Sequence, residues 1–332
     1  MKSLLFYISL LLLLTLSSCT DRITRNIIIS LPSEVKEGQT ILQTPAGQRE
    51  KVYVIDGNIC SIYERGIDRC VLEIQPLSDT SHSISLIPYG SEPGEMLLVD
   101  CSASGSKILI RDIVQKTYTV VDVTKVMEDS SHRIESLPMT LLTQEMVPFN
   151  NDKILYLNQG SFRSKEPRFY IIGTEEQGHK LSKNGERSLN VLDGTLLYNQ
   201  ENNRIAFVHL YSPVVELYIA QNKRLRCTAS ISRSEEAEVV YVSNDSINQY
   251  LFANKVIICF MTATSDNERI VAAYRDEQDN SRILLFDWDG NLLGGFIVEG
   301  EVWSVSLYND YLYCWERGKE QDMLVQYKLD IL

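Results

Sequence analysis

The sequence lacks the motifs by which most enzyme active sites are recognised. Its four histidines show no HxH or HxxxH spacing; they are His82, His132, His179 and His209. No CxxC pair and no Gly-x-Ser-x-Gly elbow occurs. These absences disfavour a histidine or cysteine metal centre and leave a serine hydrolase without its nucleophile. We therefore expect no cofactor, and a binding protein more readily than an enzyme.

The sequence also lacks a run of basic residues. Its 32 Lys and Arg are outnumbered by 44 Asp and Glu, which gives a formal net charge of −12. An acidic surface repels phosphate backbones and disfavours nucleic acid as a partner. Without a Lys/Arg cluster, lipid headgroups would attract the chain only weakly. Membrane attachment must therefore come from acyl chains.

No apolar run is long enough to cross a bilayer as a helix, which takes about 20 residues. The apolar run over residues 4–16 follows Lys2 and matches the h-region of a cleaved signal peptide. It leads into Leu16-Ser17-Ser18-Cys19, which resembles the bacterial lipobox.

A lipobox predicts cleavage before Cys19 and lipidation of that cysteine, which would anchor the protein in a membrane of the cell envelope. A plain signal peptide with a chance cysteine is the alternative. We expect a signal peptide over residues 1–18, a lipidated tether over 19–25 and one folded domain over 26–332.

The remaining chain alternates short strand patterns with turns and shows no amphipathic helix longer than about three turns. Asp-Gly pairs separate apolar runs at residues 52–63 and 283–297, as in two-residue hairpins. Strands at intervals of about 8 to 15 residues, without βαβ alternation, predict antiparallel sheets. Groups of four strands fill about 50 residues, so we expect an all-β, six-bladed propeller of four-stranded antiparallel blades. A pair of two-sheet sandwiches is the alternative.

A propeller must also close its ring. We expect residues 26–31 to pair with the last strand, residues 324–329, because that strand would otherwise leave an open edge.

Two segments carry a family resemblance. Residues 85–96 contain Gly90, Pro93, Gly94 and Glu95 in an order similar to a Gly-x-Gly-Pro-Gly-Glu-aromatic segment, and residues 282–293 resemble a late-blade hairpin. Both are similar to segments of the TolB-like and NHL-like six-bladed β-propeller lipoproteins of Bacteroidetes. The resemblance implies this fold and an outer-membrane location, on the periplasmic or the surface face, without an assigned activity.

The residues of the first segment have a structural interpretation. Gly94 would adopt a positive φ, Pro93 would stiffen the loop, and Glu95 would accept hydrogen bonds from backbone N–H groups. The alternative is that Glu95 reaches a ligand near the central channel. The chain departs from the family at Glu92 and Met96.

Cys60 and Cys70 are candidates for a disulfide. A tight turn near residues 65–66 would place them opposite each other in an antiparallel pair, at a distance that a disulfide accepts. The alternative is two free, buried thiols.

Ser246 is a candidate for O-glycosylation. Asp245-Ser246-Ile247 matches the short Asp-Ser/Thr-apolar pattern used in Bacteroidetes envelopes.

These features predict a lipid-anchored binding or scaffolding propeller of the cell envelope, with an envelope protein or a glycan as its partner. One alternative is a glycan- or solute-binding lipoprotein of an uptake system, with Trp288, Trp303 and Trp315 as stacking candidates. Another is a metal-dependent propeller lactonase or lyase that holds its metal through channel carboxylates.

Overall fold

The computed structural model describes residues 25–63, 70–129, 134–139, 143–149, 153–158, 169–172, 194–211, 213–221, 224–232, 239–243, 248–252, 259–276 and 279–329. Cys19, with the proposed signal peptide, and Ser246 lie outside these residues. The described fold begins at Arg25, at the end of the expected tether.

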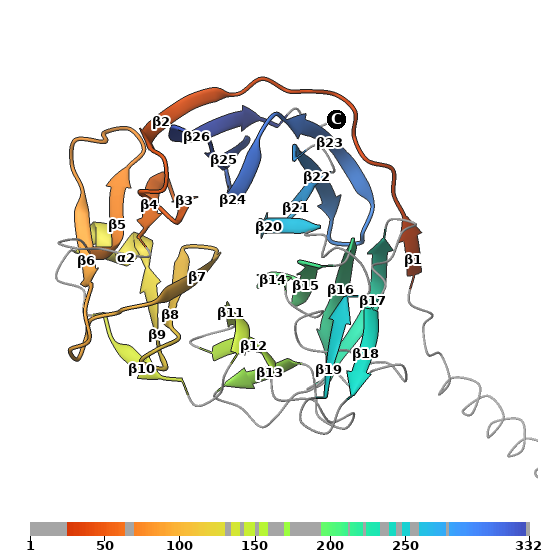
Figure 1. Ribbon diagram of the computed structural model, residues 1–332, viewed down its shortest axis with the longest axis horizontal. Coiled ribbons are helices and arrows are strands. Elements are labelled where there is room, and N and C mark those ends of the chain that lie inside the picture. Colours follow the sequence, from red (N-terminus) through yellow and green to blue (C-terminus); the bar gives the residue numbers. More distant parts are fainter. Residues whose placement is uncertain are drawn as a thin grey trace, which may run out of the picture.

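The described strands form sheets around a central axis, and within them every pairing but that of the N-terminal strand is antiparallel (Figure 1). The first sheet contains β3 (Lys51–Ile55), β4 (Asn58–Ile62), β5 (Cys70–Pro76) and β6 (Ile84–Pro88). The second contains β7 (Val99–Ser104), β8 (Lys107–Asp112), β9 (Thr117–Asp122) and β10 (Ser136–Pro138). The third contains β11 (Thr143–Phe149), β12 (Lys153–Asn158) and β13 (Phe169–Ile172).

Three further sheets complete the ring. One contains β14 (Gly194–Asn199), β15 (Arg204–His209), β16 (Val214–Gln221), β17 (Arg224–Ser232) and β1 (Arg25–Ile28). The next contains β20 (Phe260–Ser265), β21 (Arg269–Arg275), β22 (Ser281–Asp287) and β23 (Leu292–Val298). The last contains β24 (Glu301–Tyr308), β25 (Tyr311–Arg317), β26 (Gln321–Lys328) and β2 (Gln39–Pro45).

The fold is therefore an all-β propeller with four-stranded blades, but the prediction of six such blades is wrong. Five sheets have four strands or more, whereas the sheet of β11, β12 and β13 has three within the described part of the chain. Strand patterns at regular intervals predict six equal blades. The spacing of strands along the sequence does not show how many strands join each sheet.

Both predicted hairpins are present, but only the first has a two-residue turn, because residues 288–291 join β22 to β23. Asp56 and Gly57 join β3 to β4 with φ values of 49° and 73°, which are the positive values that a two-residue turn of this type needs. Asp289 and Gly290 lie in the turn between β22 and β23.

Apolar side chains on both faces of the sheets form the core. Each neighbouring pair of sheets shares a buried cluster; for example, Ile62 and Leu72 of the first sheet share one with Ile108 of the second. Because both faces of this central strand are covered, β8 is buried at consecutive positions, and its Ile108-Leu109-Ile110 form an unbroken apolar run where a half-exposed strand would alternate. The burial of these runs supplies most of the driving force for the ring.

The N-terminal segment crosses the outer edges of three consecutive blades, and we call it the strap (residues 25–45; Figure 1). It begins as β1, which pairs in parallel with β17. It continues along β23, where the backbone N–H of Ile297 donates to the carbonyl of Glu34 at 2.6 Å. It ends as β2, which pairs antiparallel with β26.

The strap corrects the prediction of ring closure. Residues 26–31 do not pair with the last strand; β2 covers the edge of β26 instead, and β1 lies two blades away. An N-terminal strand does close the last blade, but the closing residues come 13 positions later than predicted.

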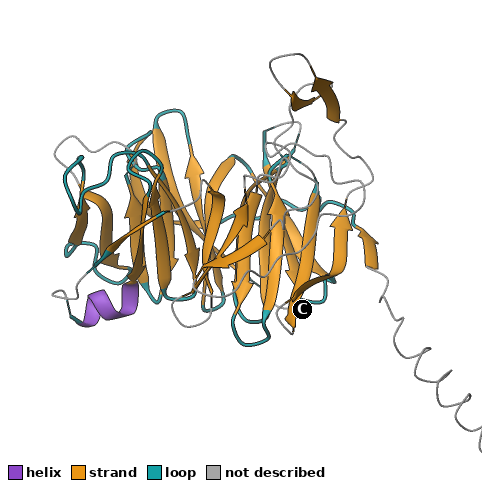
Figure 2. Cartoon of the chain, turned by 90° about the horizontal axis from the view of Figure 1, so that it is seen from below, coloured by secondary structure: helices purple, strands orange, loops and turns teal. Residues whose placement is uncertain are grey.

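The ring has two distinct faces (Figure 2). One face carries the short helix α2 (Val123–Glu128), whose Asp122 side chain accepts the N–H of Lys125 as an N-cap. On the other face the hairpin of β18 (Val239–Ser243) and β19 (Asn248–Phe252) projects from the ring. We call these the α2 face and the hairpin face. No helix among the described residues is long and apolar enough to cross a membrane.

Candidate functional sites at the two ends of the channel

A large cavity opens on the α2 face, where the turns after several inner strands meet. It has a volume of about 750 Å³ and is lined by residues of four sheets. The turn that joins β7 to β8 lies on one side, and the turns after β14 and β20 lie on the other. We call this cavity the α2-face pocket.

Three aromatic side chains form part of its wall. Phe149 and Tyr198 lie with ring centroids 4.3 Å apart, and Tyr118 comes from the neighbouring sheet. Each of the three is only 6% to 8% exposed, so they present small apolar surfaces and not open ring faces. The Tyr198 hydroxyl donates to Asn203 at 3.0 Å, which fixes its ring.

Polar side chains complete the pocket. The Asn267 amide donates to the carboxylate of Glu201 at 2.5 Å, and the Asn199 amide donates to the Asn267 carbonyl at 2.8 Å. Glu135 and Lys153 also line the cavity. A site with apolar walls and a few fixed polar groups is typical of small-ligand pockets.

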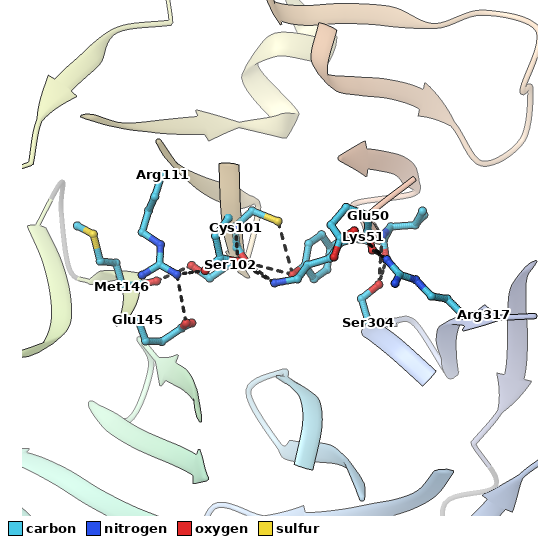
Figure 3. Close-up of polar contacts among 12 residues, drawn as sticks. Glu50, Lys51, Cys101, Ser102, Arg111, Glu145, Met146, Ser304 and Arg317 are labelled. Carbon is cyan, nitrogen blue, oxygen red and sulfur yellow. Dashed lines mark hydrogen bonds and ion pairs between the residues drawn. The ribbon is translucent and has the colours of Figure 1, made fainter. Parts of the chain in front are cut away.

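The opposite end of the channel, on the hairpin face, holds a smaller cavity of about 190 Å³ beside a line of ion pairs (Figure 3). The Lys51 ammonium lies 2.9 Å from Asp100, and Arg111 bonds to the same carboxylate. Arg111 also lies 3.8 Å from Glu145. Two cations and two carboxylates thus cross three neighbouring sheets, and their formal charges cancel.

Burial changes the acid–base behaviour of this cluster. It raises the pKa of the Tyr53 hydroxyl and of the Cys101 thiol, so both stay protonated at neutral pH. Burial opposes the charge on Lys51, but its acidic surroundings, the Glu145 carboxylate among them, outweigh burial and raise the pKa of the ammonium. The cluster therefore holds a charged lysine and no thiolate nucleophile.

The tryptophans do not form a stacking platform. Trp315 and Trp288 are 0% and 4% exposed and belong to the core. The Arg317 guanidinium carbon lies 3.4 Å from the centroid of the Trp303 ring and covers it, and Arg317 also pairs with Glu50 at 2.8 Å. The sequence could not show this, because the covering arginine is 14 residues away on the next strand.

A metal-dependent lactonase or lyase would hold its metal through carboxylates of the channel. Within the described ranges, no group of three or more His, Cys, Asp and Glu side chains could hold a metal ion. The channel carboxylates Asp100 and Glu145 bind Lys51 and Arg111 instead.

The family-like loop connects β6 at the outer edge of one blade to β7 beside the axis (Figure 1). Gly94 has a φ of 92°, and the carboxylate of Glu95 accepts the backbone N–H of Glu92 at 3.0 Å. The amide of Gln115 donates to the Gly90 carbonyl at 2.9 Å. These contacts, together with Pro93, shape the loop and give the motif a structural role. Glu95 lines neither of the two channel cavities.

Cys60 and Cys70 are not brought together. The register of β4 and β5 places Cys60 opposite Ile74, and Cys70 lies opposite Pro88 of β6. Both cysteines are free thiols. The tight turn assumed near residues 65–66 predicted a register that differs from this one by four residues.

One buried carboxylate lies away from the channel. The Glu316 side chain on β25 accepts the Tyr327 hydroxyl at 2.7 Å. Burial raises the pKa of Glu316 to about 7, although the bond from Tyr327 acts in the opposite direction. Sequence reasoning missed this group because Glu316 stands near a strand end and is followed by the charged residues Arg317, Lys319 and Glu320, a pattern typical of a solvated turn.

This shift predicts a pH dependence of stability. Between pH 4.5 and about 7 the unfolded chain has released the Glu316 proton while the folded chain retains it. The free energy of unfolding should therefore fall by about 1.4 kcal/mol per pH unit, or about 3 kcal/mol across the window. Glu316→Gln should remove this slope in urea unfolding measured from pH 4.5 to 8, whereas Glu268→Gln at an exposed turn should keep it. An unchanged slope in Glu316→Gln would refute the assignment.

Comparisons with known proteins support the fold. No family model and no curated protein match the chain. A crystal structure of a Bacteroides fragilis NCTC 9343 protein (BF0058), provisionally designated as exported, matches with a TM-score of 0.59 and 12% identity over 92% of this chain and 99% of that chain. A member of the DUF4221 family from Bacteroides vulgatus ATCC 8482 matches with a TM-score of 0.51 and 10% identity over 88% of this chain and 98% of that chain. At these identities the likeness establishes the fold alone, and the TolB-like or NHL-like family stays a prediction.

Proposed function

We propose that this protein is a lipid-anchored β-propeller of the cell envelope that binds a small ligand in the α2-face pocket. The observation that carries the proposal is the size of that pocket. Its volume of about 750 Å³ falls inside the range of about 300 to 1,000 Å³ that is usual for ligand sites. The cavity on the hairpin face, at about 190 Å³, is smaller than that range.

The envelope location rests on the sequence and on one comparison. The lipobox-like Leu16-Ser17-Ser18-Cys19 would place a lipid six residues before the first strand. A protein of the same fold, BF0058, carries a provisional designation as exported. The resemblance to outer-membrane propeller lipoproteins agrees with both, so we propose attachment to the outer membrane through Cys19.

The alternative roles receive less support. Stacking on a glycan needs exposed ring faces, whereas the aromatic residues of the α2-face pocket and two of the tryptophans are nearly buried. A metal-dependent lactonase or lyase needs carboxylates available as ligands, whereas Asp100 and Glu145 are engaged by Lys51 and Arg111. Binding of a small ligand in the α2-face pocket requires neither exposed aromatic ring faces nor carboxylates that are available to a metal.

A thermal-shift screen of envelope-derived sugars, peptides and carboxylates tests the proposal. Ser106→Trp should fill the α2-face pocket from the turn between β7 and β8. Ser81→Trp is the matched control, because Ser81 lies on an exposed turn outside the pocket. We expect a compound that raises the Tm of the wild type and of Ser81→Trp but not that of Ser106→Trp. A screen in which no compound distinguishes the two variants would contradict the proposal.

A further inference from the structure

A groove beside the start of the strap gathers three arginines that lie far apart in the sequence. Arg25 begins β1, Arg204 begins β15, and Arg226 lies on β17. The register places Arg204 opposite Ile219, and Ile219 opposite Arg226. Directly opposed residues project from the same face of a sheet, so Arg204 and Arg226 flank Ile219 on one face. Together with Arg25 they line a cavity of about 260 Å³.

The charges in this groove are not balanced. Asp289, from the neighbouring blade, is the one carboxylate among the lining residues, and it lies 2.6 Å from Nη1 of Arg204. Arg25 contacts the neutral side chain of Asn291 at 3.4 Å. Among the described residues, the buried Nε of the Arg226 side chain has no hydrogen-bond partner, and no carboxylate of the groove lining is paired with it. Two guanidinium groups therefore line the groove without a carboxylate.

An unpartnered, buried N–H group is costly, and an anion in the groove would accept its hydrogen bond. Arginine is the side chain best suited to oxyanions, because its planar guanidinium donates two parallel bonds to a phosphate or carboxylate. The side chains around Arg226 are apolar or neutral apart from the other arginines and the paired Asp289. The site therefore selects a negatively charged ligand.

We propose that this groove, lined by Arg25, Arg204 and Arg226, binds phosphate groups. The source that the structure favours is an anionic lipid headgroup. Arg25 follows Cys19 by six residues, and six extended residues span at most about 20 Å. A lipid on Cys19 would thus hold the groove within reach of the headgroup layer. The choice of a lipid source rests on the proposed anchor, whereas phosphate binding itself does not.

The test uses the unacylated mature chain, residues 19–332 with Cys19→Ser. Inorganic phosphate is titrated into it by calorimetry, and its co-sedimentation is measured with phosphatidylcholine vesicles that contain or lack 30% phosphatidylglycerol. Arg226→Gln removes the unpartnered guanidinium, and Arg25→Gln alters an exposed residue whose loss should not disturb the core. Lys319→Gln is the control, because Lys319 is exposed in the turn between β25 and β26.

We expect Arg226→Gln to lower the affinity for phosphate at least tenfold, Arg25→Gln to lower it less, and Lys319→Gln to leave it unchanged. Binding to the anionic vesicles should fall in parallel and should weaken with added salt. Phosphate binding without a vesicle preference would uphold the site and overturn the lipid as its source. Equal phosphate affinity in the wild type and both arginine variants would overturn the site. Acylation of Cys19 is measured separately, so a failure of the anchor cannot be mistaken for a failure of the groove.

Discussion

A chain that begins at residue 47 should lose the cooperative unfolding of the propeller, whereas a chain that begins at residue 33 should keep it. The shorter chain lacks β2, which pairs with β26 from Gln39 to Pro45. Its loss exposes the edge of the last blade and removes Ile41 and Leu42 from the cluster around Trp315. The backbone contact that follows β2 is lost as well, since in the full chain the N–H of Ala46 donates to the Glu320 carbonyl at 3.0 Å.

We expect the free energy of unfolding to fall by about 5 kcal/mol or more in the chain that begins at residue 47, which is comparable with the whole stability of a domain. The chain that begins at residue 33 is the matched control. It loses β1, a strand added to a sheet that already has four others, and the partly buried Ile29 and Leu31 that follow it, but it keeps β2 and the closed last blade. Urea unfolding followed by circular dichroism distinguishes the two chains. Equal midpoints would show that β2 does not close the ring.

Replacing Arg111 by methionine should cost about 3 kcal/mol of stability. The Arg111 side chain is 4% exposed and binds both Asp100 and Glu145. Its removal takes the Arg111 cation away from the Glu145 carboxylate, which is 12% exposed. Breaking a buried pair from one side typically costs 3 to 5 kcal/mol, and we take the lower end because Asp100 is one-third exposed and keeps Lys51.

Two further variants test whether the loss of the Arg111 charge causes the expected fall in stability. Arg111→Met combined with Glu145→Gln should recover part of the loss, because the carboxylate that faced Arg111 is then replaced by a neutral amide. Lys125→Met should cost less than about 1 kcal/mol, since Lys125 is 62% exposed in its pair with Asp122. Equal losses in Arg111→Met and Lys125→Met, measured by urea unfolding, would refute the importance of the buried network.

The hairpins were predictable from sequence because their signals are local. Asp56-Gly57 joins two apolar runs directly, and only a tight turn fits that spacing. Register was not predictable where both faces of a strand are buried. Most positions of β4 and β5 are buried, so no alternation of polar and apolar residues fixes their pairing, and Cys60 faces Ile74 instead of Cys70.

The candidate sites depend on contacts between distant segments. The α2-face pocket takes its wall from Tyr118, Phe149 and Tyr198, which belong to three sheets. Arg25, Arg204 and Arg226 form a basic groove that no run of the sequence contains, because β1 joins β17 only in the folded ring. Spacing along the chain cannot show either site, since the ring topology decides which turns and edges meet.

The membrane anchor is tested most directly by metabolic labelling of the protein with an alkyne fatty acid in its native host, followed by membrane fractionation. We predict that the wild type carries the label and sediments with the outer membrane. Cys19→Ala should carry no label and should leave that fraction or remain as uncleaved precursor. Label that persists in Cys19→Ala, or a wild type that is unlabelled and soluble, would contradict a lipid-anchored propeller.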